Sequence, residues 1–86
     1  STIEDVLGIE LKSSKKGVIV SKVDANGAFA QNRLRVGDRI VAINGQKVHK
    51  MDDFTTLLYN AKSAHRGSAV FTIQRGNSQG QIEMPI

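Results

Sequence analysis

The segment that most constrains this chain is residues 34–45, Leu-Arg-Val-Gly-Asp-Arg-Ile-Val-Ala-Ile-Asn-Gly. The Gly37-Asp38 pair predicts a tight turn, because glycine tolerates positive φ and an aspartate side chain can accept a hydrogen bond from nearby backbone. The β-branched and apolar residues at 40–43 predict a short strand. The Asn44-Gly45 pair is typical of a type I′ hairpin turn, which needs positive φ at both positions. This segment therefore predicts a turn, a strand and a turn, and it carries no chemistry of its own.

Alternating and continuous apolar residues predict further strands on both sides of this segment. Residues 7–12 alternate, with Leu7, Ile9 and Leu11 on one face, as expected of a strand with one buried face. Gly17–Val23 has a nearly continuous apolar centre, which indicates burial on both faces. The remaining expected strands are 46–48, Ser68–Arg75 and 80–86, with polar loops or turns at 13–16, 24–27 and 76–79.

Two segments predict helices of different length. Ala28–Gln31 suits one or two turns, which Asn32 could close in a left-handed conformation. Met51–Ser63 predicts the longer helix, with Asp52 or Asp53 as its cap and the basic pair before Gly67 suiting its end. Apolar residues recur on one face of this helix at Phe54, Leu57, Leu58 and Ala61. The expected fold class is α+β, mainly β: a partly open barrel or sandwich of five to six strands with one short and one long helix.

Composition excludes several functions. A chain of 86 residues is expected to form a single domain, residues 1–86, and its start at a serine suggests a piece of a longer protein. Without cysteine it has no disulfide, and two isolated histidines make a poor metal site, so we expect no metal and no cofactor. No serine-nucleophile motif is present, so we expect no catalytic residue and no enzymatic activity in this domain.

The net charge of +4 gives only weak attraction for anionic partners. Its densest basic group is Lys12, Lys15 and Lys16, which we expect to be solvated. We expect no nucleic-acid binding, since the three phenylalanines suit core positions and a single tyrosine is the only other aromatic residue. No apolar run reaches the length of a membrane span, so we expect no membrane insertion.

The chemistry that remains is recognition by backbone groups. Val6-Leu7-Gly8-Ile9 is an apolar–glycine–apolar turn that enters a strand, and such a turn can direct several N–H groups at one carboxylate. Gly8 removes a side chain where a ligand would approach, while Leu7 and Ile9 can line an apolar pocket. An ordinary strand start that contains glycine explains the same residues equally well.

The order of these elements, with the Gly-Asp-Arg-Ile and Ile-Asn-Gly motifs of residues 37–45, resembles a PDZ domain over nearly the whole chain. The short link to the long helix and the last sixteen residues are most similar to PDZ domains of HtrA/Deg-type serine proteases. Two departures from that pattern are Arg33, where glycine is common, and Ala28-Phe29, which replaces Ser/Thr-Pro-Ala. Asn32 could compensate for the missing glycine at position 33 by adopting the left-handed conformation itself.

The resemblance implies a set of site residues. The loop Val6, Leu7, Gly8 and Ile9 would bind a peptide carboxylate, and the strand Ile9, Glu10, Leu11 and Lys12 would pair with the peptide. Met51, Thr55 and Leu58 would face the groove, while Phe54, Leu57 and Ala61 pack inward, although Leu58 fits both faces. Met51 stands where many PDZ domains that select Ser or Thr near the peptide end carry histidine, so a hydrophobic ligand is expected.

The implied function is a peptide-binding module that recognises C-terminal or extended hydrophobic segments by strand addition and serves an HtrA-like serine protease. The alternative is an assembly or interaction module, as in the second PDZ domain of such proteases or in a secretion-system or scaffold component. For the first role the partner would be a peptide or protein C-terminus, preferably a hydrophobic one. The alternative role would not capture free C-termini, and its partners would include further copies of the parent protein. A bacterial HtrA-like parent would be periplasmic or in the cell envelope.

Overall fold

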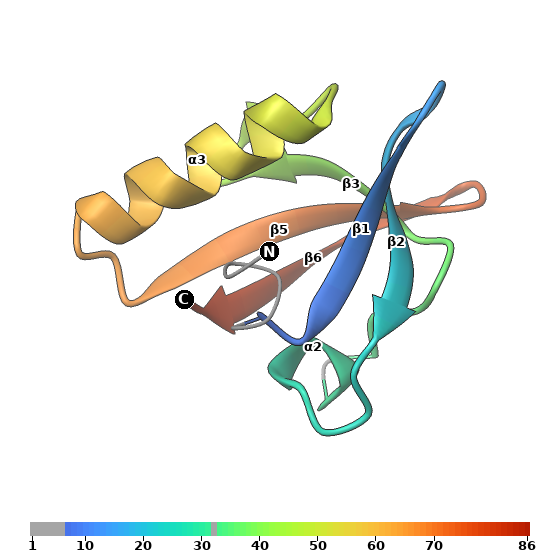
Figure 1. Cartoon of the computed structure of the whole chain (residues 1–86), viewed down its shortest axis with the longest axis horizontal. Helices are drawn as coiled ribbons and strands as arrows, with labels where there is room; N and C mark the ends of the chain where they lie inside the picture. The colour runs from blue at the N-terminus through green and yellow to red at the C-terminus, as the bar shows by residue number, and fades with distance from the viewer. Residues whose placement is uncertain (1–6, 32) are drawn as a thin grey trace.

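The computed structural model describes residues 7–31 and 33–86. One antiparallel sheet has the strand order β1-β2-β3-β5-β6, with β4 paired to β3 beside this path (Figure 1). The longer helix packs against β2, β3 and β5. The elements are β1 (Ile9–Ser14), β2 (Gly17–Val23), α2 (Ala28–Gln31), β3 (Arg39–Ile43), β4 (Gln46–Lys47), α3 (Met51–Ser63), β5 (Ser68–Arg75) and β6 (Ser78–Pro85). The sheet is not closed, and the mainly-β expectation with one short and one long helix is confirmed.

Two hairpins differ from the prediction because their strands continue into polar sequence. β1 runs to Ser14, which pairs with Gly17, so the loop predicted at 13–16 shrinks to a two-residue turn. β1 also begins at Ile9 rather than at residue 7, since Gly8 has φ +76° and cannot belong to an extended strand. In the last hairpin Arg75 pairs with Ser78, which leaves only two residues in the turn. Hydrogen-bond pairing thus extends strands that hydropathy alone ends too early.

The Asn44-Gly45 turn is confirmed, with φ of 51° and 79° at its two positions. Asn44 has a second role that its turn propensity does not predict. Its Oδ1 accepts a hydrogen bond from Val70 N–H at 2.8 Å, and its own N–H donates to the Val70 carbonyl at 2.8 Å. The turn is thereby attached to β5, which fixes the end of β3 in the sheet.

The core is built around the three phenylalanines, as expected. Phe29, Phe54 and Phe71 are each at most 2% exposed. The rings of Phe29 and Phe71 meet edge to face, with centroids 5.1 Å apart and planes at 79°. This geometry is the favourable one for aromatic pairs and joins α2 to β5.

The start of α3 is capped by Asp53. Its Oδ2 accepts the N–H groups of His49 and Lys50 at 2.9 and 3.0 Å. These two hydrogen bonds lower the pKa of Asp53, because they favour the ionised carboxylate. Of the two predicted caps, Asp53 makes the contact.

The end of α3 uses a histidine where glycine is usual. His65 has φ +55°, its N–H donates to the Lys62 carbonyl, and Arg66 N–H donates to the Ala61 carbonyl. This pair of hydrogen bonds is a Schellman motif, whose left-handed position favours glycine. The sequence led us to expect Gly67 as the residue that ends the helix, but the left-handed turn is completed two residues earlier.

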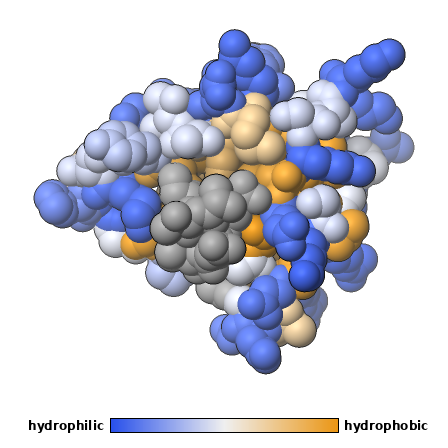
Figure 2. All heavy atoms as spheres, viewed as in Figure 1, coloured by the Kyte–Doolittle hydropathy of each residue, from blue (hydrophilic) through white to orange (hydrophobic). Residues whose placement is uncertain are grey.

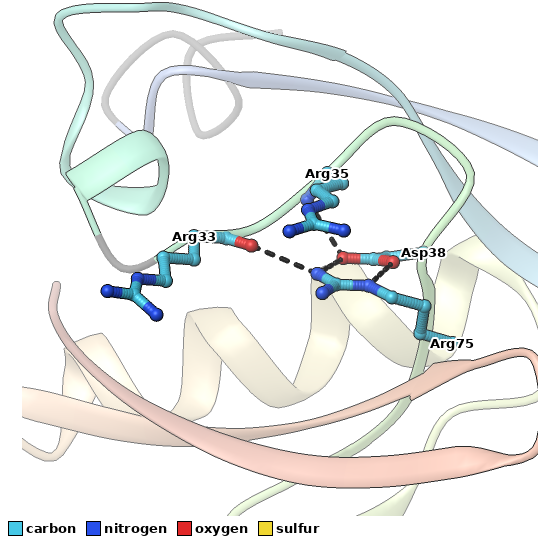
Figure 3. A network of polar contacts seen from close by, with 4 residues as sticks. All are labelled: Arg33, Arg35, Asp38 and Arg75. Carbon is cyan, nitrogen blue, oxygen red and sulfur yellow. Dashed lines mark hydrogen bonds and ion pairs between the residues drawn. The ribbon is translucent and has the colours of Figure 1, made fainter.

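Asp38 lies at the centre of a polar network that joins β5 to the turn before β3 (Figure 3). The carboxylate accepts the Arg35 N–H at 2.8 Å, as expected of an aspartate in this turn, and the Asp38 residue is buried. Arg75 donates to both carboxylate oxygens and to the Arg33 carbonyl. Arg33 itself has φ +66°, so it keeps the left-handed conformation that glycine would favour, and Asn32 lies outside the described residues.

Candidate functional site

Gly8 makes a sharp bend immediately before β1. Its φ is +76°, and its carbonyl accepts the Asp24 N–H at 2.8 Å. A Cβ at Gly8 would lie 2.9 Å from the Cα of Gly27, closer than real Cβ contacts. Sequence reasoning assigned the missing side chain to ligand approach, whereas the structure shows that packing against the turn at 24–27 requires it. Close packing against a second glycine, Gly27, therefore fixes the bend.

The apolar residues on either side of Gly8 are buried. Leu7 and Ile9 are each 3% exposed and belong to the hydrophobic core. Val6 lies outside the described residues. The side chains of Leu7 and Ile9 thus hold the bend in place, and little of their surface remains for a ligand.

β1 lies at one end of the strand order, next to β2 alone among the described strands. Along it, Leu11 is half-buried, whereas Glu10 and Lys12 are exposed. Glu10 forms an ion pair with Lys22 of β2, with the carboxylate oxygen 3.6 Å from Nζ. The strand is thus apolar on its inner face and charged on its outer face, as its alternation predicts.

α3 presents different residues on its two flanks. Met51 is half-buried, Thr55 is exposed and Leu58 is 1% exposed within the core. Figure 2 shows hydrophobic atoms at the surface between α3 and β1, where the predicted groove would lie. Leu57 lies on the other flank, beside Ile43 and Ala61 in a hollow of about 300 Å³. The groove assignment of Met51, Thr55 and Leu58 stays a prediction.

A second hollow, of about 590 Å³, lies beside Gly8 and Ile9 on the β2 side. Its lining includes the carboxylates of Glu10 and Asp24, with Lys22 as the cation. Since Lys22 already pairs with Glu10, this hollow has the wrong charge for a peptide carboxylate. A carboxylate would therefore have to approach the bend from its other side, toward α3.

Sequence reasoning missed the two residues that hold the Gly8 bend. Asp24 and Gly27 were predicted only as parts of a turn, and the Gly27 N–H closes that turn on the Asp24 carbonyl at 2.9 Å. A glycine at each of two turns is weak as a signal, because nothing local shows that they meet.

In the part of the chain that is described, neither helix has the length and apolarity of a transmembrane segment.

Comparison with known proteins gives a consistent picture. The family model for the PDZ domain matches residues 5–86. Two relatives are probable periplasmic DegP-like serine endoproteases. The one from Rhizobium meliloti is 32% identical over 93% of this chain, and the one from Bartonella henselae is 30% identical over 99%. The chain spans only 16% and 17% of the length of these two relatives.

Solved structures agree in fold. The HtrA3 PDZ domain bound to a phage-derived ligand, FGRWV, superposes with a TM-score of 0.73 over 92% of this chain and 81% of that one, at 19% identity. The PDZ domain of EpsC from Vibrio cholerae, residues 204–305, gives a TM-score of 0.74 over 100% of this chain and 85% of that one, at 21% identity. At these identities the likeness establishes the arrangement of elements.

Proposed function

The chain belongs to the PDZ domain family, a family of non-catalytic protein-interaction modules, and from this premise we propose that it binds C-terminal tails by strand addition to β1. The observation that carries the proposal is the Gly8 bend, held against Gly27, which leads directly into a terminal strand of the sheet. A carboxylate at this bend would meet backbone N–H groups, and the preceding residues of the tail would lie along β1 toward Ser14.

The ligand that fits best ends in apolar residues. The region between β1 and α3 offers the half-buried side chains of Leu11 and Met51, and hydrophobic atoms reach the surface there (Figure 2). With Met51 at the start of α3, an apolar side chain of the tail would be preferred over a hydroxyl. The affinity should be modest, because a short tail gains few hydrogen bonds against the cost of its ordering.

We further propose that the module regulates a periplasmic DegP-like serine protease or delivers substrate to it. This proposal rests on the names of the two relatives, of which this chain spans a small part. The protease activity, the compartment and any oligomer would belong to the whole protein.

The pentapeptide FGRWV, the ligand of the HtrA3 domain, supplies the test. We would titrate the ¹⁵N-labelled domain with FGRWV as the free acid and as the C-terminal amide. We expect the acid to bind at least tenfold more tightly and to shift the resonances of residues 8–12 and of α3. Equal affinities would contradict carboxylate capture, and the absence of binding by either form would favour the assembly role. A charged residue in place of Leu7 would not test carboxylate capture, because that side chain is buried and the change would disturb the core.

A further inference from the structure

We propose that the turn between β1 and β2 binds an acidic segment of the ligand, located just upstream of the bound C-terminal tail. The proposal rests on the proposed function and adds a second recognition element to it. Four cationic residues at this end of the molecule define what we call the cationic end: Lys15, Lys16, Arg39 and Lys50.

The direction of the ligand brings it to this turn. A tail whose carboxylate lies at Gly8 must run antiparallel to β1 and leave the strand beside Ser14. β1 has six residues, which corresponds to about 20 Å at roughly 3.3 Å per residue. The tail residues that precede about the sixth position from the C-terminus therefore pass the turn at Lys15 and Lys16.

The turn is ordered by its own hydrogen bonds. The Ser14 hydroxyl donates to the Gly17 carbonyl at 3.2 Å and accepts the Lys16 N–H at 3.1 Å. Lys15 and Lys16 are both exposed. Their charges are thus presented from a defined position at the end of β1, rather than from a structureless loop.

Two other segments add their charges to the turn. A Cβ at Gly17 would lie 3.5 Å from Cδ of Arg39 and 3.6 Å from the carbonyl oxygen of His49. Lys50 follows His49 and is exposed. The β1–β2 turn and the start of α3 lie at the same end of the molecule, where hydrophilic side chains project (Figures 1 and 2).

Acidic residues offset this charge only in part. Neither recorded ion pair of the described chain, Lys22–Glu10 or Arg75–Asp38, involves the cationic end. The acids nearest to Lys50 in sequence are Asp52 and Asp53, which line a hollow with Lys47 and Leu57 on the opposite flank of α3 from Thr55. Asp38, which precedes Arg39, is buried and paired with Arg75. Asp53 keeps its negative charge beside Lys50, whose N–H its carboxylate accepts, so it offsets one of the four cations. A ligand leaving β1 therefore meets a net positive charge.

The test compares three peptides that all end in FGRWV. Four glutamates, four serines or four lysines would precede this tail, so that the variable residues occupy positions six to nine from the C-terminus. At low ionic strength we expect the glutamate peptide to bind about five- to tenfold more tightly than the serine peptide, and the lysine peptide more weakly. The difference should shrink strongly in 0.5 M salt, which screens exposed charges.

Two double variants locate the effect. With Lys15→Gln and Lys16→Gln together, the ratio of glutamate to serine affinities should fall to about one. The matched control, Lys62→Gln with Arg66→Gln, removes two exposed cations from the far end of α3 and should retain the ratio. A ratio lost equally in both double variants would show general attraction and overturn the proposal.

The remaining outcomes separate this inference from the proposed function. If FGRWV binds and the glutamates add nothing, the inference fails and tail binding stands. If no FGRWV peptide binds, the proposed function fails, and this inference with it. If the glutamate peptide binds equally well as the C-terminal amide, or if phosphatidylglycerol vesicles compete with every peptide, the cationic end is an independent anion surface and the inference is wrong.

Discussion

Arg75 and Asp38, which are 37 positions apart in the chain, form a two-point ion pair. Nε and Nη2 of Arg75 donate to the two carboxylate oxygens at 2.7 and 2.6 Å. The Asp38 side chain is 2% exposed and the Arg75 side chain 43% exposed, so the carboxylate depends on this partner far more than the guanidinium does. Removing the carboxylate charge should therefore destabilise the turn before β3.

We expect Asp38→Asn to lower the free energy of unfolding by roughly 1–3 kcal/mol, because the amide cannot accept both hydrogen bonds from Arg75 and the one from Arg35. Urea unfolding followed by circular dichroism would measure this loss. Asp52→Asn, at an exposed position, is the control and should change little. An equal loss in both variants would refute a special role for Asp38.

The same pair makes the free energy of unfolding depend on pH, because Asp38 must be ionised to bind Arg75. Burial raises the pKa of Asp38, but the hydrogen bonds from Arg75 and from the Arg35 N–H outweigh it, so the pKa lies below its usual value. The carboxylate therefore stabilises the fold above the usual aspartate pKa of about 3.9, and this contribution is lost as pH falls through the lower folded value. Below about pH 4 the stabilities of wild type and Asp38→Asn should converge; a constant difference down to pH 2 would contradict the assignment. Asp53 also has a lowered pKa but is present in both proteins, so it cancels from the difference.

Gly8→Ala tests the close contact between Gly8 and Gly27. Gly8 and Gly45 have almost the same φ, +76° and +79°, but a Cβ at Gly45 would meet nothing within 4 Å. Gly45→Ala should therefore cost only the left-handed backbone, about 1 kcal/mol, whereas Gly8→Ala should cost about 1–2 kcal/mol more. Thermal unfolding compares the two variants. Equal losses would mean that the contact with Gly27 relaxes without cost.

His65→Gly should stabilise the protein by about 0.5–1 kcal/mol, because glycine adopts the left-handed conformation at the end of α3 without steric cost. Ala64→Gly is the control, since Ala64 has φ −82° and gains nothing from glycine there. That variant should be destabilised instead. Both values follow from urea unfolding, and a loss of stability in His65→Gly would show that the imidazole contributes a contact that outweighs the backbone strain.

Local patterns predicted most of this fold because its elements follow local rules. Gly17–Val23, Ala28–Gln31, Met51–Ser63 and Ser68–Arg75 have the predicted bounds, since apolar periodicity and capping decide them. What could not be predicted depends on residues distant in sequence. Arg75 as the partner of Asp38 and Gly27 as the neighbour of Gly8 follow from the packing of the sheet.

The candidate site was harder to predict than the fold for a physical reason. An apolar residue that lines a groove and one that fills the core follow the same periodicity. Leu7, Ile9 and Leu58 are all buried, whereas Met51 is half-buried and Thr55 exposed, and the sequence pattern alone does not separate them. Only a change at an exposed position can test the groove without disturbing the core.

Thr55 and its neighbour Thr56 provide this test. Both are exposed, but successive helix positions are about 100° apart, and Thr56 lines the hollow with Lys47 on the other flank of α3. In Thr55→Glu, an apolar tail would have to desolvate the new carboxylate and approach it with its own negative end. We expect affinity for FGAWV, which carries no side-chain charge, to fall three- to tenfold in fluorescence titrations. Thr56→Glu adds the same charge and should leave the affinity within twofold of wild type. If both variants weaken binding equally, net charge alone explains the effect, and if neither does, the tail does not lie between β1 and α3.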